Sequence, residues 1–137
     1  MESYLTYKKY HKNPVNITIH ILCIPVIVWT STILIMNLSN VSFILTNLYI
    51  FYYTYLNKTY FYPMAIALYS NWVLAHYFFI NFPHKNKIAI ILNILGWIAQ
   101  VIGHSFFEKN KPAFMDSLVQ SFLMAPLFVY LELRTLS

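Results

Sequence analysis

The segment GWIAQVIGHSFFEKNKPA, residues 96 to 113, is apolar enough for the interior of a bilayer, yet it carries polar side chains at regular spacing. Gln100, His104 and Glu108 follow one another at intervals of four residues. Residues four apart lie on one face of an α-helix, so the spacing predicts a helix with a single polar stripe. Polar groups are costly within lipid, and such a stripe therefore indicates contact with other helices or a functional site.

The whole chain shares this apolar character. Of its 137 residues, 59% are hydrophobic and only 9% are charged, whereas a soluble domain has about 25% charged residues. So few charges cannot cover a water-facing surface, and the composition predicts an integral membrane protein. The length suits one domain over residues 1–137, and the lone Cys23 excludes a disulfide within the chain.

Apolar runs divide the chain, and short breaks rich in Asn, Ser, Pro and Lys separate them. A helix needs about 20 residues to cross the hydrocarbon core. Four of the runs are long enough, while the second is shorter. The expected fold class is therefore an all-α, integral membrane helical bundle with four to five transmembrane helices. The runs are Pro14–Met36, Val41–Leu56, Tyr60–Ile80, Lys87–Phe107 and Pro112–Leu133.

The basic residues lie in the breaks between the apolar runs, and the net charge is +5. This distribution is typical of lysines that meet lipid headgroups, and it argues against a nucleic-acid-binding patch. With five spans, the N-terminus shares one side of the membrane with most of these residues. The positive-inside rule then predicts a cytoplasmic N-terminus. That side holds Lys8, Lys9, Lys12, Lys58, Lys109 and Lys111; the other holds Lys85, Lys87 and Arg134.

Three histidines are expected near one membrane surface. His20 lies about two turns into the first span, and His104 lies about one turn before the end of the fourth, which runs in the opposite sense. His11 precedes the first span on the same side. Asn16 lies four residues before His20 and shares its face of the helix.

Three imidazoles at one depth suit a metal ion, although imidazole binds iron, zinc and copper alike. Two other interpretations stay open. The histidines are hydrogen-bonding groups between helices in a non-catalytic scaffold or lipid-binding protein, or His20 and His104 hold a haem in an electron carrier. His76 is expected near the opposite surface, as a packing or hydrogen-bonding residue.

Two stretches carry a resemblance to a known family. YHKNPVNITIHILCIP, residues 10 to 25, and GWIAQVIGHSFFEKNKPAFMDSLVQSFLMAPLFVYLE, residues 96 to 132, resemble the small membrane family of 2-hydroxy fatty acid dioxygenases. The shared pattern is Tyr-His, then Asn, His and Pro, followed far downstream by Gln-x-x-Gly-His-x-x-x-Glu and Pro-Ala. Members act in fatty acid α-oxidation, including phytosphingosine degradation, at the endoplasmic reticulum.

The resemblance implies a non-haem Fe(II) enzyme whose metal ligands are His11, His20 and His104. Around them, Gln100, Asn16 and Glu108 are expected to orient ligands or move protons, with Glu108 as an alternative fourth ligand. Two departures stand out. Lys12 replaces a second histidine that some members carry, and Cys23 replaces a glycine that many carry.

The implied substrates are a 2-hydroxy fatty acid and O2, with membrane lipid as the surroundings. A 2-hydroxy acid offers a hydroxyl and a carboxylate on adjacent carbons, which suits a metal with open positions. Cleavage between C1 and C2 yields CO2, water and an acid one carbon shorter. This reaction balances with O2 alone, and no Gly-rich dinucleotide loop occurs in the sequence.

Overall fold

The computed structural model describes residues 5, 8, 12–108 and 118–136; for residues 108 and 118–122 it describes the backbone only. Helices make up nearly all of these residues. Within these residues there is no strand, so the prediction of an all-helical fold is confirmed. The elements are α2 (Pro14–Ile35), η1 (Met36–Leu38), α3 (Val41–Leu56), η2 (Lys58–Tyr60), α4 (Phe61–Asn81), α5 (Lys85–Ile102), η3 (Gly103–Glu108) and α6 (Leu118–Leu136).

Turn chemistry sets the ends of the helices. Asn13 Oδ1 accepts a hydrogen bond from the backbone N–H of Val15 at 2.9 Å, and α2 begins at Pro14, where proline needs no hydrogen-bond partner. Asn57 Oδ1 accepts from the backbone N–H of Thr59 at 3.0 Å in the break before α4. These breaks lie where the sequence predicts them; the expected start of the last run, at Pro112, lies outside the described residues.

Two helices of the described part are long and apolar enough to cross a membrane. They cover Pro14–Leu38, with 25 residues, and Lys85–Phe107, with 23 residues. The apolar helix Val41–Leu56 is shorter, while polar residues such as Asn71 in α4 and Glu132 in α6 interrupt the other two. The count of four to five spans therefore stays a prediction.

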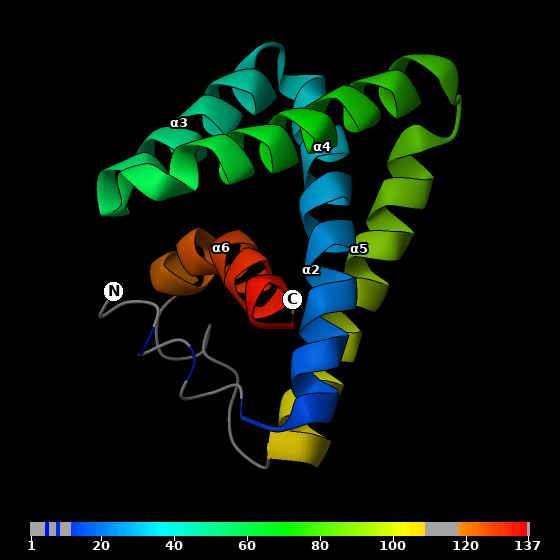
Figure 1. Ribbon diagram of the computed structural model, residues 1–137. Helices are drawn as coiled ribbons and strands as arrows, with labels where there is room; N and C mark the ends of the chain where they lie inside the picture. The colour runs from blue at the N-terminus through cyan, green and yellow to red at the C-terminus, as the bar shows by residue number, and fades with distance from the viewer. Residues whose placement is uncertain (1–4, 6–7, 9–11, 109–117, 137) are drawn as a thin grey trace. The chain divides into compact units, whose positions relative to one another are not determined.

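The chain forms two compact units. The terminal unit consists of Met1–Val26 and Ile94–Ser137, and the central unit consists of Ile27–Asn93. α2 and α5 each contribute one part to both units. In the central unit, α3 and α4 lie side by side and are joined by the short η2 turn (Figure 1).

Apolar packing and hydrogen bonds together hold the central unit. Its core contains Ile33, Met36, Ala75 and Ala89, with Trp29, Leu34, Trp72, Phe78 and Phe79 packed against it. Asn93 Nδ2 donates to Thr30 Oγ1 at 2.9 Å and to Ser31 Oγ at 3.0 Å, which links α5 to α2. Further bonds between helices join Asn37 to Asn86, Asn71 to Thr32, and Trp72 to Ser42.

Candidate metal centre

Two buried histidines meet inside the terminal unit. His20 comes from α2 and His104 from η3, and the two residues are 1% and 2% exposed. The ring centroids lie 5.0 Å apart and the rings are perpendicular, at 89°. The yellow end of the α5–η3 segment lies beside the blue first turns of α2 (Figure 1). The structure thus brings together two of the three histidines that the sequence proposes as ligands.

The protonation of His20 follows from its hydrogen bond. Its Nδ1 lies 2.9 Å from the backbone oxygen of Asn16, one turn earlier in α2. A carbonyl oxygen only accepts, so Nδ1 carries the proton and donates it. In a neutral ring the lone pair then lies on Nε2. Histidines that bind metals usually have their second ring nitrogen held by a carbonyl or carboxylate in this way.

His104 lies on an unusual piece of helix. At Gly103 the α5 helix continues as a six-residue π-helix, which ends at Glu108. π-Helical turns are rare and occur frequently at functional sites. A Cβ atom added at Gly103 would overlap the side-chain oxygen of Asn16 and lie 3.5 Å from Ile19 Cδ1. The missing side chain therefore allows η3 to approach α2 closely, just where the two histidines meet.

Gln100 and Asn16 are buried on the same two helices. Asn16 is 0% exposed and Gln100 is 7% exposed. The amide nitrogen of Gln100 has no hydrogen-bond acceptor among the described residues. An unsatisfied buried amide costs about 1–3 kcal/mol, so an acceptor from outside the described residues is expected. On the other side, the ring of Phe128 in α6 lies edge-on to His20, with centroids 6.4 Å apart.

The structure does not describe the side chains of two other proposed site residues, His11 and Glu108. His11 lies outside the described residues, and only the backbone of Glu108 is described. Within the described part, no group of three or more His, Cys, Asp and Glu residues is placed to hold a metal ion. His76 belongs to α4 in the central unit, where it is exposed and stacks on Trp72 with centroids 5.0 Å apart.

The spacing of the histidine rings bears on the haem alternative. Imidazoles that bind one metal from opposite sides have ring centres roughly 6 Å apart. Two metal–nitrogen bonds of about 2.1 Å each, together with the distance from each nitrogen to its ring centre, separate the two centres. The observed separation of 5.0 Å is shorter. The pair therefore suits neighbouring positions on a single ion better than the two faces of a haem. Nitrogen donors of this kind fit iron.

The comparisons with known proteins agree with the pattern at both ends of the chain. Residues 1–136 match the family described as Mpo1-like, 2-hydroxy-palmitic acid dioxygenase Mpo1-like. The chain belongs to this family. The 2-hydroxy-palmitic acid dioxygenase MPO1 of Saccharomyces cerevisiae is 31% identical over 133 residues, which cover 92% of this chain and 74% of the yeast protein. The resemblance inferred from the sequence is confirmed. No solved structure matches the chain.

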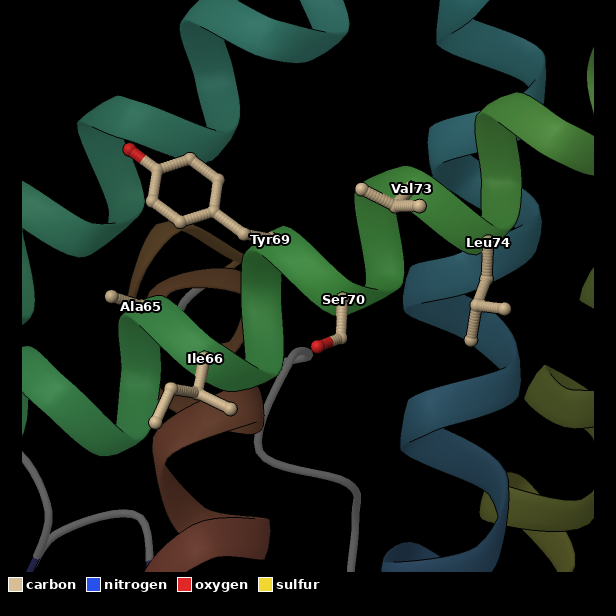
Figure 2. A pocket seen from close by; sticks show the side chains of 6 residues that line it. All are labelled: Ala65, Ile66, Tyr69, Ser70, Val73 and Leu74. Atoms are coloured by element: carbon tan, nitrogen blue, oxygen red, sulfur yellow. The ribbon is translucent and has the colours of Figure 1, made fainter.

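A groove elsewhere on this Mpo1-like protein offers no comparable chemistry. Ala65, Ile66, Tyr69, Ser70, Val73 and Leu74 line an open, largely apolar groove along one face of α4 (Figure 2). The hydroxyl of Tyr69 donates to Asn47 Oδ1 in α3, so it joins two helices. The six residues that line the groove include no histidine and no acid.

Sequence reasoning missed three features of this Mpo1-like terminal unit. One is the close approach of Gly103 to Asn16, and another is the contact of Phe128 with His20. The third is the ion pair between Lys8 Nζ and Glu132 Oε1, which lie 3.1 Å apart. The Glu132 side chain is only 9% exposed. A signal existed for the first alone, because the chain has only two glycines and one directly precedes His104.

Proposed function

We propose that this Mpo1-like protein is a non-haem iron dioxygenase that converts a 2-hydroxy fatty acid to CO2 and the fatty acid one carbon shorter. The buried pair of His20 and His104 carries the proposal. His11, which the resemblance assigns to the same site, would be the third ligand. Membership of the family and the name of the yeast relative support the substrate class.

The reaction balances without a further reductant. R–CH(OH)–COOH and O2 give R–COOH, CO2 and H2O. The bond between C1 and C2 breaks, C1 leaves as CO2, and C2 is oxidised to the new carboxyl carbon. The four electrons released reduce O2. When bound, iron supplies open coordination positions and the redox chemistry that O2 activation requires.

The protein would fix the orientation of the ligand side chains and exclude water from the site. The Asn16 carbonyl fixes the His20 ring in the tautomer with its lone pair on Nε2. Burial of both rings excludes bulk water from their surroundings. Gln100 would donate its amide hydrogen to a carboxylate or hydroxyl oxygen of the substrate. Glu108, at the end of η3, would accept or return protons.

The membrane would hold the acyl chain of the substrate. Two candidate spans among the described helices and the low charge content support an integral membrane protein. The family resemblance implies the endoplasmic reticulum, and the apolar runs predict four to five spans. The N-terminus would be cytoplasmic, because most lysines fall on that side. An acyl chain then lies among the helices while its polar end reaches the histidines.

Turnover of a labelled acid tests the proposal. Detergent-purified protein is loaded anaerobically with Fe(II) and given O2 and 2-hydroxypalmitic acid labelled at C1. The expected result is labelled CO2, equal molar uptake of O2 and formation of the 15-carbon acid, with no turnover by His104→Ala. His76→Gln is the matched control, since His76 is exposed in the central unit. Absence of labelled CO2 from iron-loaded protein would overturn the assignment.

A further inference from the structure

We propose that Gly103 is a positioning residue, which sets the arrangement of His20 and His104 through its contact with Asn16. This inference rests on the proposed metal site and deepens it. Gly103 does not touch substrate or metal in this account. It acts through the residue that it packs against and through the histidine that follows it in the chain.

Gly103 and the side chain of Asn16 are in close contact. A Cβ atom at Gly103 would overlap Asn16 Oδ1 and lie 3.3 Å from Asn16 Cγ. Real Cβ atoms do not approach other atoms so closely, so any larger residue requires a shift of η3 or of the Asn16 side chain. Asn16 is 0% exposed, and Ile19 Cδ1 lies 3.5 Å from the same point. Because Asn16 is fully buried, its side chain would have to move within the packed interior and not out into the surroundings.

Asn16 has two roles at once. Its side chain meets Gly103, while its backbone oxygen accepts the hydrogen bond from His20 Nδ1. A shift of the first turns of α2 would therefore change the orientation of the His20 ring. A shift of η3 would move His104, because His104 is the next residue. Either response changes the relation between two rings that now lie 5.0 Å apart.

The π-helix begins at Gly103, so its first turn lies against α2 at the point where no side chain intervenes. π-Turns in helices occur frequently at functional sites. The glycine thus permits the approach that brings His104 from η3 into edge-to-face contact with His20.

A double-mutant cycle separates positioning from general packing. Asn16→Ala removes Oδ1 and Cγ, the two atoms that a methyl group at position 103 would meet, but keeps the backbone oxygen that holds His20. We expect Gly103→Ala to weaken Fe(II) binding about 10- to 100-fold, as changes around metal ligands typically do. The combined variant should bind Fe(II) as Asn16→Ala alone does, because the overlap is gone.

A second readout needs no metal. In metal-free protein with ¹⁵N-labelled histidine, the nitrogen shifts of His20 should report the Nδ1–H tautomer in the wild type and in the combined variant. Gly103→Ala should lose that signature. Wild-type Fe(II) affinity and tautomer in Gly103→Ala would overturn the inference, as would a combined variant that binds Fe(II) more weakly than Asn16→Ala. A wild-type protein that binds no iron would overturn the proposed function, whereas the tautomer experiment would still test Gly103.

Discussion

The central and terminal units both bury polar side chains among apolar helices, but they satisfy them differently. In the central unit, Asn93 donates to the buried Thr30 and to Ser31, and Trp72 donates to the buried Ser42. In the terminal unit, the rings of His20 and His104 meet edge to face, and the amide nitrogen of Gln100 has no acceptor among the described residues. The hydrogen bonds of the central unit join helices, whereas the Gln100 amide of the terminal unit is left able to donate to a ligand.

The satisfied and the unsatisfied polar groups differ in their effect on the free energy of folding. Hydrogen bonds between membrane helices contribute only about 0.6 kcal/mol on average. A buried polar group without a partner costs about 1–3 kcal/mol. A protein keeps such a group where another role compensates for the cost, and functional sites are where that occurs. Under the proposed function the chemistry lies in the terminal unit, and the polar residues of the central unit stabilise the fold.

The largest expected effect comes from the histidine pair. His20→Ala and His104→Ala should each lower turnover of a 2-hydroxy fatty acid by more than about 100-fold, since even changes around metal ligands cost 10- to 100-fold. The helix content should persist because the backbone hydrogen bonds within each helix do not depend on these side chains. Turnover assays and circular dichroism measure the two effects. Turnover that stays within about 10-fold of wild type in either variant would break the comparison.

A smaller loss is expected at Gln100. Gln100→Leu keeps the approximate volume and removes a buried donor that has no acceptor in the described structure. The free energy of unfolding should therefore be unchanged or higher, while turnover falls about 10- to 100-fold. Denaturation in mixed micelles and steady-state kinetics give both quantities. The opposite result, lower stability with full turnover, would make Gln100 a bond between helices.

Asn93 in the central unit should show the reverse pattern. Asn93→Ala removes the donor that reaches Thr30 and Ser31, so the free energy of unfolding should fall by about 0.5–2 kcal/mol. Fe(II) affinity should not change because the bond lies outside the terminal unit. Unfolding in micelles and metal titration measure these values. Loss of iron without loss of stability would assign the central unit a part in the metal site.

The smallest effect is expected at His76. It is exposed and stacks on Trp72, with ring planes 6° apart. His76→Gln should change the free energy of unfolding by no more than about 0.5 kcal/mol and leave turnover unaltered. Stability and activity assays on the same preparation test this. If this variant alone abolished turnover while folded, His76 would belong to the site and the division between units would be wrong.

The helices could be predicted closely, because they depend on local chemistry. Val41–Leu56 is both an apolar run and the observed α3, and the start at Pro14 follows from Asn13 and the proline after it. The face shared by Asn16 and His20 also follows from helical spacing. The number of spans could not be set in the same way, since polar residues in α4 and α6 lower their hydropathy.

The details of the site depend on contacts between distant residues, which spacing does not reveal. The sequence predicts an α-helix through Gly103, but the chain forms a π-helix there, at the point where η3 lies close to Asn16 of α2. The sequence places Asn16 and His20 on one face, and the structure adds that His20 bonds to the backbone oxygen of Asn16. The pairing of Lys8 with Glu132 joins residues at opposite ends of the chain.

The most direct test of the account is the iron content of the protein with and without its buried histidines. Wild-type protein, His104→Ala and His76→Gln are purified in parallel, loaded anaerobically with Fe(II), and freed of excess metal before elemental analysis. We expect about one iron per chain in the wild type and His76→Gln, and almost none in folded His104→Ala, because this variant lacks one of the proposed imidazole ligands. Wild-type iron in His104→Ala would contradict it.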